Sequence, residues 1–305
     1  MSDINAACRL GTIVPPANPA VEPEMRVLLP AEAACHYARL PVFPDTTLYE
    51  RNDLYLKAYP AALESFGSLR PDAISIAMTG SSYKLLPEGD MRMCRQLSEQ
   101  AGVPVVLFNR YEDREGVAAV TSDNFAGGRK AAEFLLAGGH QRIALIAGWE
   151  GASTQRDREA GFRSALSQAG QPVFARGKGE FKAEAARDAA RSMFDVPPDQ
   201  RPDAVFVAND HMAFSVMDVI RFELGLSIPG DVSVVGYDDV PPAAWLAYDL
   251  TTLRQRANLM VAETVATLMR LIETPDAAAP RKTALDCPLI VRGSARVPLG
   301  WTSEG

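Results

Sequence analysis

The chain has 305 residues, with 31 Lys and Arg against 38 Asp and Glu, so its formal net charge is −7. Hydrophobic residues make up 47% and charged residues 23%, which is the usage of a globular protein and excludes a disordered tail. The acidic excess is spread evenly, with 9 basic and 12 acidic residues over 1–100 and 22 and 26 over 101–305. Neither part carries a basic block that could neutralise the phosphates of a nucleic acid.

Short apolar runs alternate with longer helical stretches along the chain. The apolar runs predict strands at 9–14, 36–43, 73–78, 103–108, 142–147, 204–208, 232–237 and 289–292. The stretches between them predict helices at 21–29, 49–65, 89–100, 125–137, 157–169, 183–194, 211–224 and 257–273. Apolar strands joined by helices indicate parallel sheets covered on both faces. The length suffices for about two domains, so we expect an α/β protein with two doubly wound parallel-sheet lobes.

Neither the cysteines nor the histidines have the spacing of a metal site. Cys8, Cys35, Cys94 and Cys287 lie far apart, no Cys-x-x-Cys pair occurs, and no two histidines have helical ligand spacing. We therefore expect no metal, no disulfide framework and a reducing compartment. The chain shows no signal-peptide pattern and no apolar run near the roughly 20 residues of a membrane helix. A cytoplasmic location without membrane contact is expected.

Two glycine pairs, Gly127-Gly128 and Gly138-Gly139, do not form a nucleotide phosphate-binding loop. Helix packing and helix ends explain them better, and no cofactor is expected. Trp149 follows a predicted strand, and it either stacks on a ligand or packs in the core. His211 is expected to be a surface or packing residue, with lining a cleft as the weaker alternative.

Polar residues follow several predicted strands, where open parallel sheets bind their ligands. The turn 79–83 offers backbone N–H groups to a carboxylate, Arg156-Asp-Arg158 opens a helix, and Asn209-Asp210 and Asp238-Asp239 each follow a strand. Each has a plainer interpretation as an ordinary turn, a solvated charged face or a helix cap. Their recurrence at successive strand ends favours a binding site over any one of these explanations.

From about residue 101 to 297 the chain resembles the effector-binding core of the LacI/GalR family of bacterial transcription regulators. The matching stretches include GVPVVLFNR (102–110), VTSDNFAGGRKAAEFLLAGGHQRIALIAG (120–148), STQRDREAGFRSAL (153–166), AVFVANDHMAF (204–214) and IPGDVSVVGYDDV (228–240). The resemblance implies a type-I periplasmic-binding-protein fold, with a small molecule in a cleft between two flavodoxin-like lobes, and a homodimer. It places effector contacts at Arg158, Asn209 and Asp238, with Asn109 lining the cleft.

The implied lobes are 9–148 plus 254–276 and 149–250 plus 280–298. The family's DNA-binding headpiece has about 50–60 residues. Because the first predicted strand begins at residue 9, we expect no headpiece and no DNA binding.

Residues 9–100 instead resemble the first half of the aspartate/glutamate racemase superfamily, especially its maleate isomerase and arylmalonate decarboxylase branch. The matching stretches are RLGTIVPPANPAVEPEM (9–25), LLP (28–30) and AMTGSSYKLLPEGD (77–90). The resemblance implies donors for a substrate carboxylate at Thr79, Gly80, Ser81 and Ser82, and a substrate contact at Asn18. Met78 stands where racemising members have a cysteine, and a thioether cannot become a thiolate nucleophile. Neither Cys94 nor Cys287 is an obvious replacement.

The leading hypothesis is therefore a non-catalytic protein that binds a small-molecule effector, either a sugar or a small carboxylate. One alternative is a cofactor-independent aspartate/glutamate racemase, maleate isomerase or arylmalonate decarboxylase-like enzyme. The other is a natural or engineered hybrid scaffold with no competent site, joined near residues 96–103.

Overall fold

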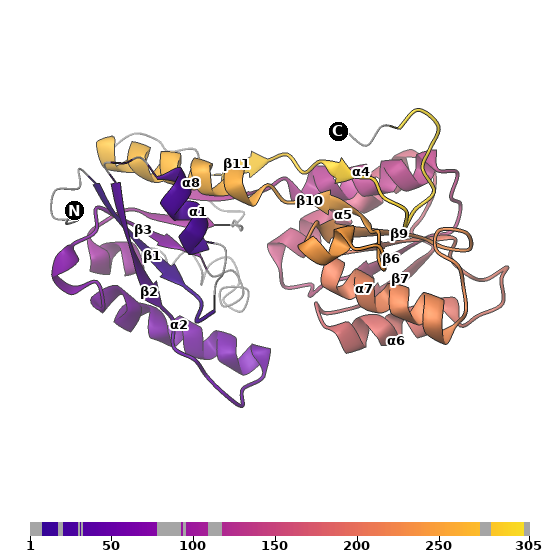
Figure 1. Cartoon of the computed structure of the whole chain (residues 1–305), viewed down its shortest axis with the longest axis horizontal. Helices are drawn as coiled ribbons and strands as arrows, with labels where there is room; N and C mark the ends of the chain where they lie inside the picture. The colour runs from indigo at the N-terminus through magenta and orange to yellow at the C-terminus, as the bar shows by residue number, and fades with distance from the viewer. Residues whose placement is uncertain are drawn as a thin grey trace. The chain divides into compact units, whose positions relative to one another are not determined.

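The computed structural model describes residues 8–17, 21–29, 31, 33–77, 93, 96–108, 118–274 and 282–301. The chain divides into two compact units (Figure 1). The first unit comprises residues 1–122 and 256–285, and the second comprises residues 123–255 and 286–305. Each unit is built around one six-stranded sheet.

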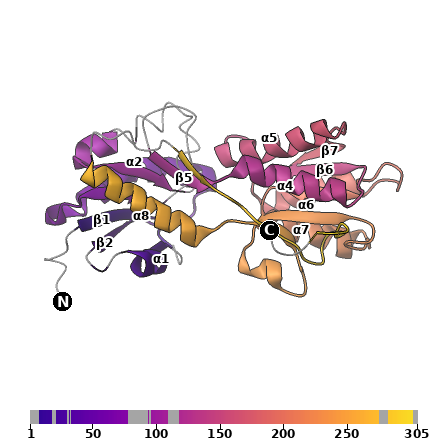
Figure 2. The ribbon, with the colours of Figure 1, turned by 90° about the horizontal axis from the view of Figure 1, so that it is seen from above.

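The sheet of the first unit is parallel throughout, in the order β11-β5-β4-β3-β1-β2. Its strands are β1 (Cys8–Val14), β2 (Ala33–Arg39), β3 (Ala73–Ile76), β4 (Val105–Phe108), β5 (Ala118–Ser122) and β11 (Lys282–Leu285). Its helices are α1 (Val21–Leu28), α2 (Leu48–Glu64) and α8 (Ala257–Glu273), with a 3₁₀ turn at Gly67–Leu69. Helices α1 and α8 cover one face and α2 covers the other (Figure 1). Figure 2 shows α8 lying lengthwise along the sheet.

The first unit has a core on each face of this sheet. Ile13 and Ile74 pack with Tyr59 of α2 on one face. Leu10 and Val106 pack with α8 on the other. Helix α2 begins sharply because Thr47 and Glu50 form a reciprocal capping box.

The sheet of the second unit has the order β12-β10-β9-β8-β6-β7 and is parallel except for the antiparallel pair β10–β12. Its strands are β6 (Ile143–Ala147), β7 (Ala175–Lys178), β8 (Ala204–Val207), β9 (Ser233–Asp238), β10 (Thr251–Arg254) and β12 (Leu289–Ile290). Its helices are α4 (Asn124–Ala137), α5 (Ser153–Gln168), α6 (Ala183–Phe194) and α7 (Asp210–Asp218). A π turn at Val219–Glu223 continues α7, and a 3₁₀ turn, η5, spans Pro241–Ala244.

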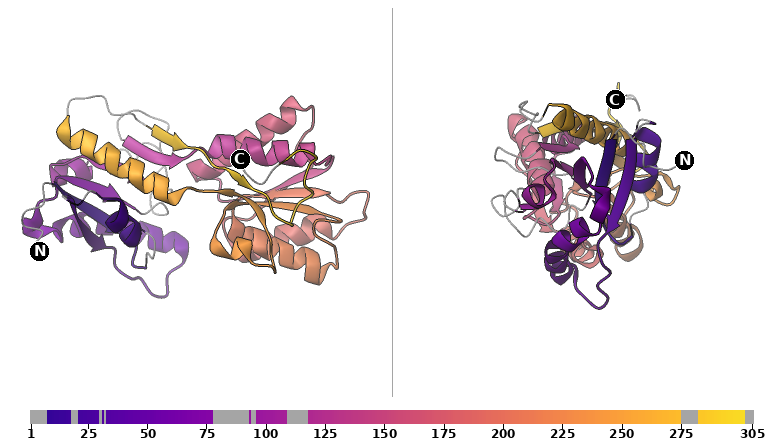
Figure 3. Two further views of the ribbon diagram at one scale, coloured as in Figure 1. Left: turned by 45° about the horizontal axis from the view of Figure 1, so that its top comes forward. Right: turned by 90° about the vertical axis from the view of Figure 1, so that its left-hand side faces the viewer.

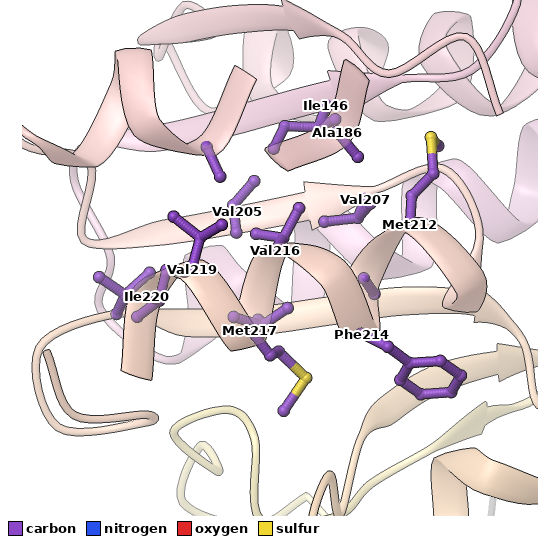
Figure 4. Close-up of a cluster of buried hydrophobic side chains, with 14 of the residues drawn as sticks. Ile146, Ala186, Val205, Val207, Met212, Phe214, Val216, Met217, Val219 and Ile220 are labelled. Carbon is purple, nitrogen blue, oxygen red and sulfur yellow. The ribbon is translucent and has the colours of Figure 1, made fainter. Parts of the chain in front are cut away.

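Helices α4 and α5 lie side by side on one face of the second sheet, and α6 and α7 cover the other (Figures 1 and 3). Side chains of α7, including Met212 and Val216, meet Val205 and Val207 of β8 (Figure 4). On the opposite face, α4 and α5 approach so closely that a Cβ at Gly128 would lie 2.0 Å from the carbonyl oxygen of Arg158. The prediction that this glycine serves helix packing is confirmed.

The predicted fold class, α/β with two doubly wound parallel sheets, is also confirmed. Strands β5, β7, β10 and β11 were not predicted. Strands β7, β10 and β11 lack a continuous apolar run, and β5 combines a short apolar run with the polar pair Thr121-Ser122. The second strand begins at Ala33 rather than at residue 36 because it pairs along the whole of β1. The predicted helix 89–100 lies partly outside the described residues.

The border between the units differs from the expected lobes most in two places, and residues 254–255 also lie in the second unit. Residues 123–148 belong to the second unit because β6 pairs with β7 and β8, not with the first sheet. Residues 282–285 belong to the first unit because β11 pairs with β5. Both differences arise from pairings between segments that are far apart in the sequence.

Within the described part of the chain, no helix is long and apolar enough to cross a membrane.

Candidate functional site

Arg158, one turn into α5, is a buried arginine with several specific contacts at the carboxyl ends of the second unit's strands. Its Nε donates to the Oδ1 of Asn124 at 2.8 Å, and its Nη1 donates to the carbonyl oxygen of Ala208 at 2.6 Å. Its Nη2 lies 3.5 Å from the Oδ1 of Asp238, and its guanidinium stacks 3.6 Å above the centroid of the Tyr237 ring. These five residues form the Arg158 site, which lies within the second unit.

The placement of Arg158 follows from the close approach of α4 and α5. A Cβ at Gly161 would lie 1.9 Å from the carbonyl oxygen of Phe125, and Gly128 is equally close to α5. Asp123 caps α4 by accepting from the N–H of Ala126, which fixes the first turn of α4 and with it Asn124. Two glycines and a helix cap therefore set where the guanidinium meets its amide partner.

Asp238 ends β9 with a φ of 120°, and Asp239 follows with a φ of 59°. The carboxylate of Asp238 accepts from the Nε2 of Gln255 at 2.6 Å. Burial raises the pKa of Asp238 above its ordinary value, while Arg158 opposes that shift. The carboxylate of Asp239 has different partners from that of Asp238. It accepts from Arg254 at 2.5 Å and from Arg292 at 2.7 Å. The left-handed turn thus directs two consecutive carboxylates to different partners.

Asn209 performs the plainer of its two predicted roles. Its side-chain oxygen caps α7 by accepting from the N–H of Met212 at 3.0 Å. The Nδ2 group is the part of the carboxamide that remains for a ligand. His211 is exposed and packs edge-on to Phe214, with ring centroids 6.2 Å apart.

Asp210 is a buried carboxyl of the strand-end pair Asn209-Asp210, of which only Asn209 was predicted as an effector contact. It accepts from the Oγ1 of Thr252 at 2.6 Å and from the N–H of Val240 at 3.0 Å. Burial, together with the negative charge of Asp238, raises the pKa of Asp210 to about 7. The signal in the sequence was its position at the end of a predicted strand, directly after Asn209.

Two further side chains near these strand ends were missed. Tyr237 is fully buried, and its hydroxyl donates to the Sγ of Cys287 at 3.1 Å. The only signal in the sequence for a role at the site was its position directly before Asp238. Phe181 follows β7, and its ring occupies the space that a side chain at Gly148 would need. It was missed because the polar strand β7 was not predicted. Trp149 is half-buried with its ring over Gly151, so both of its predicted roles stay open.

The site residues predicted for the first lobe lie outside the described residues. They are Asn18, Thr79, Gly80, Ser81, Ser82 and Asn109. Met78 and Cys94 lie outside as well. Burial raises the pKa of the Cys8 and Cys35 thiols, so neither is poised as a thiolate. Among the described residues, no group of three or more His, Cys, Asp or Glu could hold a metal ion.

A family model described as "Periplasmic binding protein-like domain" matches residues 132–295. The match covers more than half of the chain and spans every residue of the Arg158 site except Asn124. The chain belongs to the periplasmic binding protein-like domain family.

Within that family, the similar curated proteins are transcriptional regulators. The probable HTH-type transcriptional repressor ExuR of Bacillus subtilis is 31% identical over 199 residues, which cover 65% of this chain and 59% of ExuR. The regulator CelR of Thermobifida fusca is 36% identical over 203 residues, covering 65% and 58%. The ribose operon repressor of Escherichia coli is 33% identical over 196 residues, covering 63% and 58%. The chain is thus similar to part of these regulators, and it spans less than two thirds of their length.

Solved structures extend the likeness in fold over both units. A dimeric Lac repressor superposes with a TM-score of 0.74 at 23% identity, covering 95% of this chain and 99% of that one. A complex of the regulator CelR with cellobiose superposes with a TM-score of 0.72 at 26% identity, covering 94% and 84%. The curated relatives are named as transcriptional regulators, in agreement with the expected non-catalytic role.

Proposed function

We propose that the chain is the sensor core of a LacI-type transcription regulator and that it binds a small sugar at the Arg158 site. One observation carries the proposal: the guanidinium is tightly bonded to Asn124 and Ala208, but it lies 3.5 Å from Asp238. A sugar hydroxyl can donate to the carboxylate and accept from the guanidinium at once, so it suits this loosely paired side of Arg158.

The charge of the site favours a sugar over a small carboxylate. Asp238 faces the guanidinium that a ligand carboxylate would need, and Asp210 and Asp239 lie nearby. A ligand carboxylate would meet this negative charge, whereas a neutral polyol would not. Two relatives named for ribose and cellobiose support the same choice. Binding a sugar preferentially in one conformation would shift a two-state equilibrium and so report its concentration.

We further propose that the chain forms a homodimer through an apolar surface of the second unit. Trp245 and Leu246 are 59% and 98% exposed on the segment that follows the 3₁₀ turn η5. On the same segment, the ring of Tyr248 packs at a tilt against Phe214, with ring centroids 4.3 Å apart. Two adjacent, largely exposed apolar side chains of this kind suit a protein–protein contact. We also keep two predictions from the sequence. The regulator is cytoplasmic, and the residues of this chain sense the effector without binding DNA.

A thermal-shift screen tests the sugar proposal. The panel is D-ribose, D-glucose, cellobiose, D-glucuronate, maleate and malonate. A sugar at roughly 100 times its Kd adds about 2.7 kcal/mol of stability. Asp238→Asn should weaken the shift. Arg163→Ala, an exposed change on α5, the helix that carries Arg158, should leave it intact. A folded wild-type chain that responds to no sugar would contradict the proposal.

The racemase-like interpretation of residues 9–100 remains a prediction, and no described residue favours it. The described thiols of the first unit, Cys8 and Cys35, have raised pKa values, which disfavours thiolate catalysis. Racemisation of aspartate, isomerisation of maleate or decarboxylation of an arylmalonate by the purified chain would revive it.

A further inference from the structure

The carboxyl of Asp210 links three neighbouring segments of the second unit while being fully buried. Its own backbone opens α7. Its Oδ1 accepts from Thr252 in β10, and its Oδ2 accepts from the N–H of Val240, directly after β9. A Cβ at Gly236 of β9 would lie 2.3 Å from the same Oδ1, so the carboxyl rests on a strand position that has no side chain.

Val240 is the residue that follows the left-handed pair Asp238 and Asp239. Its N–H is held by Asp210, so this one hydrogen bond anchors the exit of the turn that aims Asp238 at Arg158. A non-glycine left-handed conformation is costly and persists where neighbouring contacts determine it. The carboxyl of Asp210 is such a contact.

Among the described residues, no cation pairs with the carboxyl of Asp210. From the β9 turn it faces Asp238 and Asp239, both of which raise its pKa. The nearby arginines are bonded elsewhere: Arg254 and Arg292 pair with Asp239, and Arg158 faces Asp238. On α7 its neighbour is the exposed His211, and β10 contributes the neutral Thr252.

We propose that Asp210 is a positioning residue of the Arg158 site, which holds the Asp238–Val240 turn and takes up a proton when a sugar binds. This inference rests on the proposed function, because it assumes that the sugar contacts Asp238. A bound sugar excludes water, so the repulsion between the carboxyls of Asp210 and Asp238 is screened less. The proton on Asp210 is then held more strongly in the complex than in the free protein.

The sign of the effect follows from linkage. If the complex binds a proton that the free protein lacks, affinity is higher at low pH and falls as pH rises. Burial and the two neighbouring aspartates raise the pKa of Asp210 to about 7, so the change falls between about pH 6 and 8. Exchange of one proton limits the weakening of Kd to about tenfold per pH unit.

Asp210→Asn separates positioning from proton uptake. An asparagine can donate from Nδ2 to the Oγ1 of Thr252 and still accept from Val240, which is the bonding of a protonated aspartic acid. Isothermal titration with the sugar that gives the largest shift in the panel is carried out at pH 6, 7 and 8. The wild-type Kd should weaken at least about threefold from pH 6 to 8, and the Asp210→Asn Kd should stay constant near the wild-type value at pH 6.

Two further variants and a control complete the test. Asp210→Ala removes both bonds and should weaken Kd at least about tenfold at every pH, the factor that 1.4 kcal/mol represents. Thr252→Val removes a bond that lowers the pKa of Asp210, so the midpoint of the pH profile should move upward. Asp218→Asn, on the same helix α7, should keep the wild-type profile.

The outcomes separate this inference from the function on which it rests. If no sugar binds the wild-type chain, the proposed function fails and this inference fails with it. If a sugar binds but Kd does not depend on pH, or Asp210→Asn keeps the wild-type slope, only the proton uptake is overturned. If Asp210→Ala folds and binds as tightly as Asp210→Asn, the positioning role is overturned.

Discussion

The two units share one architecture but bury different chemistry. Each has a six-stranded, mainly parallel sheet covered by helices on both faces. Among the described residues, the buried polar side chains of the first unit are neutral: Thr12, Asn52, Ser75, Thr121, Ser122, Thr264 and Thr267. The second unit buries Arg158 and Asp210 at the ends of its strands. A charge is expensive to bury unless it is bonded, so this contrast marks the second unit as the one organised around charged groups.

The ion pairs of the two units differ in the same way. In the first unit, the pair of Arg39 and Glu22 lies at the surface, with side chains 45% and 28% exposed. In the second unit, the side chain of Arg158 is 6% exposed beside Asp238. A common fold therefore does not imply a common role for its charges, because solvent screens one pair and not the other.

Replacement of Arg158 should give the largest effect. Arg158→Ala leaves Asp238 without its cation and is expected to lower the free energy of unfolding by about 3 kcal/mol. It should also abolish any sugar-induced thermal shift. Arg39→Ala in the first unit is the matched control and should cost less than about 1 kcal/mol. Urea denaturation of both variants measures the difference, and equal costs would break the comparison.

The next largest effect is expected from replacing glycines by alanine, with a greater loss of stability in the second unit than in the first. Gly128→Ala places a methyl against the backbone of α5, which cannot move without displacing Arg158, so a loss of about 2 kcal/mol is expected. At Gly11 in the first unit the nearest atoms belong to the side chains of Ile74 and Phe66, at 2.7 and 3.0 Å. These side chains can shift, so Gly11→Ala should cost less. Thermal unfolding of the two variants tests this order, and a larger loss at Gly11 would reverse it.

The pH dependence of stability should depend on Asp210. Its folded pKa of about 7 exceeds the ordinary value of 3.8, so the folded state keeps a proton that the unfolded state releases between these values. The free energy of unfolding should therefore fall as pH rises from about 4 to 7 and lose this dependence above 7. Asp210→Asn removes the titrating group, so its profile should be flatter across that interval. Urea denaturation at several pH values measures both profiles, and identical slopes would contradict the assignment.

The smallest effect on stability is expected at the exposed surface of the second unit. Replacing both Trp245 and Leu246 by Ser should change the free energy of unfolding by less than about 0.5 kcal/mol, because both are largely exposed. The same change should shift a dimer toward monomer in sedimentation experiments if this surface joins two copies. The matched double variant Val27→Ser and Val42→Ser, at exposed positions of the first unit, should leave the association unchanged.

Much of the fold could be predicted because buried parallel strands leave a clear trace in the sequence. Runs such as 142–147 and 204–208 are apolar at nearly every position, since both faces of their sheet are covered. The polar strands β7 and β11, at the outer ends of their sheets, have no such apolar run and were missed.

Part of the site could also be predicted. Local motifs identified Arg158 and Asp238 as site candidates, and the structure brings them together.

What the sequence by itself determined is thus the α/β class, the alternation of its elements and the residue types at the strand ends. The tertiary structure alone decided the border between the units, the bond of Arg158 to Ala208 across 50 residues and the contact of Asp210 with Thr252 across 42. The physical reason is that hydrophobic periodicity is local, whereas the protonation and pairing of a charge depend on every group around it in space.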